Sequence, residues 1–277
     1  MSNSLAYHVV VHALEGRAGW TPMARFASAV SHVIQGHLPY QRYHAAGMAR
    51  SPKGSAPGVI ERLVNDFLAT DINPSYLLLS SFRREADVFV AFNAYNQSAN
   101  LGVQTSLGGR GAGNVARGAT RASRVAASDP DSCRHGTLAI VDTMLATTRA
   151  NAAAPDGAPH RSLGTLALLL GIESSTAAEV AFVFESEGHL PISQLAGRLG
   201  CHQRTLERRL REAGMTAEAL RQAARLVRAA HRLPSGDSLT MIAADEGFSD
   251  LAHMTRAFQA AAGMPPSLIR KLGKGQN

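Results

Sequence analysis

The sequence contains little cysteine, no long hydrophobic run and no signal-peptide pattern. Two of its 277 residues are cysteines, Cys133 and Cys201, and they lie too far apart to form a CxxC metal pair. We therefore expect a reducing compartment and no disulfide framework. The longest apolar stretch, near residues 165–172, is too short to cross a bilayer. Residues 1–16 lack a basic region and a cleavage site, so we expect a cytoplasmic protein with no membrane partner.

The balance of charge is basic. Lys and Arg number 28 against 21 Asp and Glu, which gives a formal net charge of +7 and a pI near 10. This favours a polyanionic partner only weakly, because many solvated surfaces are mildly basic. The length is that of one large domain or two ordinary ones.

The first part of the chain reads as globular. Apolar residues recur at helical spacing in residues 59–68, which predicts a helix. Residues 76–81 and 88–92 are apolar and aromatic and bracket a charged turn, which predicts a β-hairpin. From these patterns we expect residues 1–172 to form an N-terminal region of α+β class.

A segment near residues 101–132 is rich in Gly, Ala, Ser and Arg and predicts flexible or irregular structure. Within it, GAGNVA at residues 111–116 fits a dinucleotide-binding pattern, but no convincing strand precedes it, so a glycine-rich loop is the better interpretation. Its arginines favour a solvated linker over an arm that touches DNA; they are Arg110, Arg117, Arg121 and Arg124. Residues 138–150 predict a helix and residues 151–161 a linker.

The last third of the chain predicts short helices with sharp ends. After a short helix over residues 239–245, Gly247 suits the left-handed position that ends it, and Phe248 can pack into the corner. Ser249 or Asp250 can cap the next helix, which Gly263 ends. That helix places Met254, Ala257, Phe258 and Ala261 inward and Leu251, Ala252, Thr255, Arg256 and Gln259 outward. Two short helices joined in this way form a helix-turn-helix unit.

An earlier stretch repeats the construction. Residues 192–199 and 203–212 predict two helices around Gly200, with Leu206 and Leu210 inward. Between the two units, residues 216–233 predict a helix of about fifteen residues that ends near Leu233 and is about 22 Å long at 1.5 Å per residue. Such a spacer can hold two recognition helices about one DNA turn apart. Nine arginines and three glutamates lie from Arg198 to Arg232, a positive excess where phosphates would be met.

These motifs carry a resemblance. GFSDLAHMTRAFQAAAGMPPSLIR and ISQLAGRLGCHQRTLERRLREAGMTAEALRQAARLVRAAHRL, over roughly the last hundred residues, resemble the DNA-binding domain of AraC/XylS transcription regulators. The resemblance implies an all-α domain over residues 173–277, with seven helices and two helix-turn-helix units joined by a long helix. It also implies promoter DNA and RNA polymerase as partners, in activation or repression, and leaves a homodimer open.

The resemblance assigns roles by position. It places Arg204, Glu207 and Arg208 on the groove-facing side of the first recognition helix and Leu251, Ala252 and Arg256 on that of the second. With their neighbours Gln203, Arg211 and Thr255, these residues form the predicted DNA-binding set. Structural positions fall on Gly247, Phe248, Phe258, Gly263 and Pro266.

Some residues depart from the family pattern. His202 stands where Ser or Thr is usual and is a poorer helix cap. Met254 replaces an aromatic residue and Ile269 a common Tyr, changes that a core tolerates. Leu251 and Ala252 offer no hydrogen bonds, so base reading by the second unit depends on Arg256 and on apolar contact with thymine methyl groups.

The remaining candidate residues indicate neither a metal site nor a catalytic site. Five histidines occur within the first 44 residues, but no Cys or carboxylate is paired with them as a metal site requires; they are His8, His12, His32, His37 and His44. No catalytic constellation can be assembled, so we expect no catalytic residue, no metal and no cofactor, and not an enzyme.

The favoured hypothesis is a transcription regulator that responds to a small effector through residues 1–172. A DNA-binding protein whose N-terminal region only dimerises it is an alternative, and an enzyme fused to a helix-turn-helix module is another.

Overall fold

The computed structural model describes residues 4–50, 57–108, 118–154, 160–188 and 190–274. The described residues are mostly helical, with two small antiparallel sheets. No helix among them is long and apolar enough to cross a membrane. GAGNVA at residues 111–116, Arg110 and Arg117 lie outside the described residues, as do residues 155–159 of the predicted linker over residues 151–161. The start of that linker prediction is wrong, because residues 151–153 are helical.

The N-terminal region has eight helices and four strands in its described residues. They are β1 (Leu5–Tyr7), α1 (His8–Glu15), α2 (Pro22–Ile34), β2 (His37–Pro39), α3 (Tyr40–Arg50), α4 (Pro57–Leu68), α5 (Pro74–Ser81), α6 (Glu85–Ser98), β3 (Val103–Leu107), β4 (Ala119–Ser123), α7 (Asp131–Ala153) and α8 (Leu163–Leu169). β1 pairs with β2, and β3 with β4. The predicted helices over residues 59–68 and 138–150 are confirmed within α4 and α7.

The predicted hairpin over residues 76–81 and 88–92 is wrong, because both stretches are helical. Asn73 caps α5 by accepting from the Ser75 backbone N–H at 2.9 Å, and Pro74 occupies the first helical position. α6 begins with Glu85 and Asp87 in its first turn, where negative charge favours a helix start. α5 is buried on nearly all sides, so its apolar run has no period to separate helix from strand. α6 does have a helical period, in which Val88, Ala91 and Tyr95 are buried, but residues 88–92 are too short a window to show it.

The segment near 101–132 is not irregular throughout. β3 and β4 form an antiparallel ladder from Val103↔Ser123 to Leu107↔Ala119, and α7 begins at Asp131. Arg121, expected to be solvated, forms an ion pair with Asp129 in which its Nε lies 2.7 Å from the carboxylate. The ladder forms because alternate residues of β3 face the core, which the surrounding Gly-rich composition conceals.

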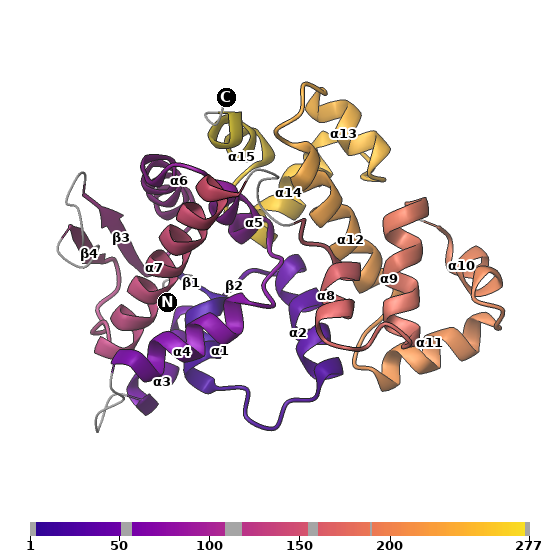
Figure 1. Cartoon of the computed structure of the whole chain (residues 1–277), viewed down its shortest axis with the longest axis horizontal. Coiled ribbons are helices and arrows are strands. Elements are labelled where there is room, and N and C mark those ends of the chain that lie inside the picture. Colours follow the sequence, from indigo (N-terminus) through magenta and orange to yellow (C-terminus); the bar gives the residue numbers. More distant parts are fainter. Residues whose placement is uncertain (1–3, 51–56, 109–117, 155–159, 189, 275–277) are drawn as a thin grey trace.

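The C-terminal region consists of helices alone in its described residues. They are α9 (Thr176–Glu187), α10 (Ile192–Arg198), α11 (Gln203–Glu212), α12 (Ala217–Arg232), α13 (Leu239–Asp245), α14 (Leu251–Ala262) and α15 (Pro266–Gly273). In Figure 1, α10 and α11 lie at one end of α12, and α13 lies at the other.

The two regions share one hydrophobic core. α2 packs against both α12 and α14, and α5 packs against α14 and α15. Figure 1 shows α14 at the centre of the molecule, between the N-terminal helices and α12. Phe26 and Val33 of α2 and Leu226 and Phe258 of the C-terminal helices are at most 1% exposed. The sequence pattern therefore changes near residue 172, but the hydrophobic core continues across this boundary.

Candidate functional site

The first helix pair, α10 and α11, is joined by a turn around Gly200. This glycine has φ of 61°, and the Cys201 N–H donates to the carbonyl of Ala196 at 3.0 Å. A left-handed glycine with this backbone bond ends the first helix and starts the second at a fixed angle. Leu206 and Leu210 are fully buried, as predicted. The His202 side chain makes no capping bond to α11.

The predicted DNA-facing side chains of α11 lie on its outer face. All are exposed except for the half-buried Glu207; they are Gln203, Arg204, Glu207, Arg208 and Arg211. Gln203 donates to the Glu207 carboxylate at 2.8 Å, and the Arg208 guanidinium donates to Glu212 at 2.6 Å. These exposed bonds are weak and can be exchanged for bonds to an anionic partner.

The second helix pair, α13 and α14, has a similar turn with one more residue. Gly247 has φ of 77°, and the Phe248 N–H donates to the carbonyl of Ala243 at 2.9 Å. Of the two predicted caps, Asp250 is the N-cap and accepts from the His253 N–H at 2.6 Å. This hydrogen bond lowers the pKa of Asp250, and the nearby charge of Arg256 lowers it further.

The inner face of α14 is buried as predicted, whereas the outer face is only partly exposed. The buried residues are Met254, Ala257, Phe258, Ala261 and Ala262. Arg256 and Ala252 are exposed, whereas Leu251 and Thr255 are half-buried, and the Thr255 hydroxyl donates to the carbonyl of Leu251 at 2.8 Å. Arg256 is thus the main exposed donor among the four predicted DNA-facing residues of this helix.

The ends of α14 and α15 follow their sequence signals. Gly263 caps α14 in the left-handed conformation with φ of 65°, and Pro266 is the first residue of α15. Phe248 is buried in the corner, where its ring lies 5.4 Å from that of His253. Leu251, which the sequence analysis placed on the outer face, packs partly against the core.

Some arginines of α12 bind acids in α13 and directly beside it, so they are not free to bind phosphates. Arg228 donates to Glu246 at 2.7 Å, and Arg232 donates to Glu246 at 3.1 Å and to Asp237 and Asp245 at 2.9 Å. Glu246 is 4% exposed. This network joins α12 to the second helix pair, so the positive excess expected from the sequence is only partly available to DNA. Glu246 was missed because an acid at a helix end is usually solvated.

Arg225 also has a structural contact. Its guanidinium lies 5.5 Å from the Phe248 ring centroid, within the range of a cation–π interaction. Burial lowers the pKa of Arg225, and the charge of Arg221 adds to this effect. Arg209 is exposed on α11.

Comparison with protein families identifies this part of the chain. Residues 195–272 match the family model described as a helix-turn-helix domain. The C-terminal region is an AraC-type helix-turn-helix domain. The chain is accordingly a DNA-binding transcription regulator, and its partner is double-stranded DNA. Comparison with curated proteins and with solved structures gives no significant match.

The N-terminal region fastens the C-terminal end of α14 in the AraC-type domain. The Gly36 N–H donates to the carbonyl of Ala260 at 3.2 Å, and Asn73 Nδ2 donates to that of Ala261 at 2.8 Å. Ser98 Oγ donates to the carbonyl of Gly263 at 2.9 Å. These bonds satisfy carbonyls at a helix end, which have no partner within the helix.

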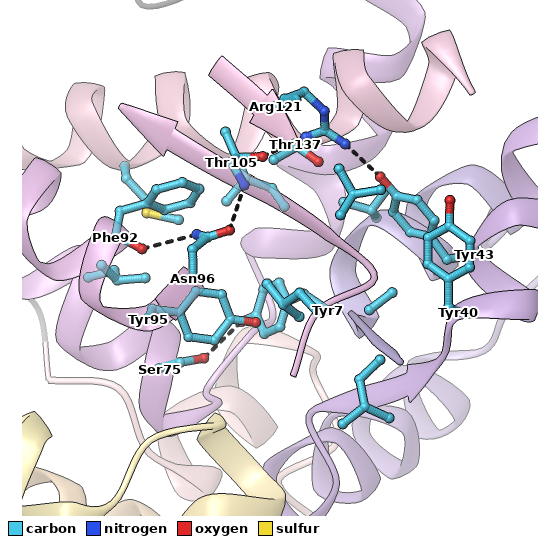
Figure 2. Close-up of a pocket in the computed structure, with 18 residues that line it drawn as sticks. Tyr7, Tyr40, Tyr43, Ser75, Phe92, Tyr95, Asn96, Thr105, Arg121 and Thr137 are labelled. Carbon is cyan, nitrogen blue, oxygen red and sulfur yellow. Dashed lines mark hydrogen bonds between the residues drawn. The ribbon is translucent and has the colours of Figure 1, made fainter. Parts of the chain in front are cut away.

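A cavity of about 50 Å³ lies in the N-terminal region, between β1, α3, α6, β3 and α7. Figure 2 shows four tyrosines on its walls, Tyr7, Tyr40, Tyr43 and Tyr95, together with polar side chains from α6, β3, β4 and α7. Val10, Leu79, Ile140 and Met144 are among its aliphatic lining. The sequence did not predict this cavity, because its walls come from segments far apart in the chain.

The early histidines are core residues in an aromatic cluster. The His8 and His32 rings stack at 4.4 Å, and His12 lies 4.6 Å from His32. Burial lowers the pKa of His32 strongly and that of His12 to about 4, so both are neutral near pH 7. Within the described ranges, no group of three His, Cys, Asp or Glu residues could hold a metal ion. His44 is half-buried beside Tyr40.

Proposed function

We propose that the chain is a sequence-specific regulator that reads two successive major grooves with α11 and α14. Both helix pairs act as helix-turn-helix units, and α12 sets their separation. α12 has 16 residues and is about 24 Å long. The observation that carries the proposal is the exposure of Arg204 and Arg208 on α11 and of Arg256 on α14, at the two ends of this spacer.

In this proposal, the two recognition helices differ in how they read bases. The α11 face offers several charged and polar groups, and a guanidinium there can donate twice to guanine O6 and N7. The α14 face offers Arg256, while Leu251 and Ala252 can only contact thymine methyl groups. We therefore expect the half-site under α14 to tolerate more base changes.

The proposal also assigns regulation to residues 1–172 and DNA binding to residues 173–277. A small effector would act on the N-terminal region, and RNA polymerase would be contacted at the promoter. The support for an effector is the cavity lined by tyrosines, together with the bonds from Gly36, Asn73 and Ser98 to α14. A dimer would place two such chains on one promoter.

Footprinting on neighbouring intergenic DNA, followed by binding to single-base variants at two salt concentrations, tests this function. Arg208→Ala or Arg256→Ala should each cost about 1–3 kcal/mol on the cognate site and leave non-specific binding nearly intact. An arginine that contacts only phosphate would weaken binding to all sequences alike and reduce the salt slope by about one. If base changes in the two half-sites reduced the affinity equally, the expectation that α14 discriminates bases less than α11 would be contradicted.

A further inference from the structure

The walls of the N-terminal cavity bear polar groups that are already paired. Asn96 Nδ2 donates to the carbonyl of Phe92 at 3.0 Å, and its Oδ1 accepts from the Thr105 N–H at 3.0 Å (Figure 2). Tyr7 donates to Asp71 at 3.0 Å. A ligand in the cavity therefore finds few polar groups waiting for a partner.

The one guanidinium on the walls is also neutralised. Arg121 donates to both carboxylate oxygens of Asp129, at 2.7 and 3.0 Å, and to the hydroxyls of Thr105 and Tyr43 at 2.7 and 2.9 Å. Four of its five N–H donors are thereby used. An anionic ligand would have to displace Asp129, so the site favours a neutral molecule.

The size of the cavity limits how a ligand enters. An apolar cavity of about 150 Å³ accepts benzene, and this one holds about 50 Å³. A single ring can therefore bind only if the walls move. Met144 is an adaptable wall residue, whereas the ring of Tyr95 is held on α6 by packing and by a hydrogen bond.

Tyr95 connects the cavity with α14. Its hydroxyl forms a 2.9 Å hydrogen bond with His37 Nε2, and the N–H of Gly36, the residue before His37, donates to the carbonyl of Ala260 in α14 at 3.2 Å. His37 lies against the helix end so closely that a methyl group added to Gly263 would be 2.9 Å from its Cε1. Ser98, one turn beyond Tyr95 on α6, binds the carbonyl of Gly263. A shift of Tyr95 thus reaches a recognition helix through one side chain.

We propose that this cavity binds a small, neutral, largely apolar molecule of single-ring aromatic class, and that its occupancy changes DNA binding through Tyr95, His37 and the C-terminal end of α14. The aromatic class follows from the tyrosine walls, which offer edge and face contacts to a ring. The inference rests on the proposed function, in which α14 reads one half-site. A ligand shifts the protein only if it favours a displaced position of Tyr95 over the position seen here, and the wall movement that a ring-sized occupant requires would supply that difference.

Binding is tested on the full chain with toluene, phenol and benzoate, by titration calorimetry and thermal unfolding. Toluene and phenol should bind saturably and raise the unfolding temperature, whereas benzoate should not. Met144→Ala widens the cavity and should tighten toluene binding several-fold. Failure of both neutral probes to bind wild type and Met144→Ala would overturn the proposal, and so would tighter binding of benzoate.

Coupling is tested by the affinity for footprinted DNA with and without saturating toluene. We expect a change of about fivefold or more in wild type. Tyr95→Phe keeps the ring but removes the bond to His37, so it should still bind toluene while the DNA response falls toward none. Tyr76→Phe, which removes the hydroxyl of a buried tyrosine outside the cavity lining, is the matched control and should keep the response. An undiminished response in Tyr95→Phe would overturn the route.

The two proposals fail differently. A chain that shows no preference for any DNA site contradicts the proposed function, and toluene binding still decides the nature of the cavity. A chain that binds its site specifically but shows equal DNA affinity with and without bound toluene contradicts this inference alone.

Discussion

The two helix pairs of the AraC-type domain are built alike and surrounded differently. α11 packs against α9 and α10, and a groove of about 450 Å³ lies between its C-terminal end and α2. α14 packs against α2, α5 and β2, and its last carbonyls accept bonds from the N-terminal region. Similar local signals thus placed α11 on the outside of the protein and fastened α14 to its centre. A change in the N-terminal region should accordingly reach α14 before α11.

The largest effect is expected from loosening α14 from within. Phe258 is fully buried, so Phe258→Ala should lower the free energy of unfolding by about 3–5 kcal/mol, measured by urea denaturation of the full chain. Gln259→Ala, on the exposed side, should stay within about 1 kcal/mol of wild type. Equal losses would mean that the buried face of α14 has been assigned incorrectly.

The second-largest effect is expected from acid, which should weaken the contact between α14 and the N-terminal region. Burial lowers the pKa of His37 to about 4, and the charge of His8 contributes. The unfolded chain, with a histidine pKa near 6.5, binds this proton first as the pH falls. Stability from a neutral His37 is therefore complete above about pH 6.5 and is lost progressively down to about pH 4, by about 2–3 kcal/mol.

His37→Gln carries no titratable group at this position and checks that expectation. Unfolding free energies at pH 7 and 4.5 should differ less in the variant than in wild type, by about 2–3 kcal/mol. The same pH dependence in both proteins would assign the acid sensitivity to other groups.

Substitutions at two acidic residues, one beside each helix pair, compare how strongly the two pairs are held. Glu246 is buried and joins α12 to α13, so Glu246→Gln should cost about 1–3 kcal/mol of unfolding free energy. Glu212 forms an exposed pair with Arg208 at the end of α11, and Glu212→Gln should cost about 0–1 kcal/mol. Thermal unfolding of both variants decides this, and a larger loss for Glu212→Gln would reverse the assignment.

The smallest effect comes from a single link between α6 and α14. Ser98→Ala removes the bond to the carbonyl of Gly263 and should cost about 0.5–1.5 kcal/mol. Amide hydrogen exchange should quicken at the C-terminal end of α14 and stay unchanged in α11. Ser186→Ala, on the exposed side of α9, is the control. Faster exchange in both α11 and α14 after Ser98→Ala would contradict the separate surroundings of these two helices.

Local signals made the helix pairs predictable from the sequence. Gly200, Gly247 and Gly263 adopt the left-handed conformations that their positions indicate, and Asp250 caps α14. These features depend on neighbours within a few residues, so the sequence states them directly. The same holds for the inward face of α14, where Phe258 and its neighbours recur at helical spacing.

Only the tertiary structure decided the secondary structure of the N-terminal region and the partners of the charged residues. The sequence indicated a hairpin where α5 and α6 form, because α5 is buried on nearly all sides and the apolar stretch of α6 is too short to show its period. It gave no sign that Arg228 and Arg232 would bind Glu246, or that Asn73 would bind α14 across 188 residues of chain. The sequence by itself determined where the C-terminal helices begin and end, since backbone dihedrals and caps are local. Which of their faces meet DNA, acids or the N-terminal region depends on contacts between distant segments, and such contacts exist only once the chain has folded.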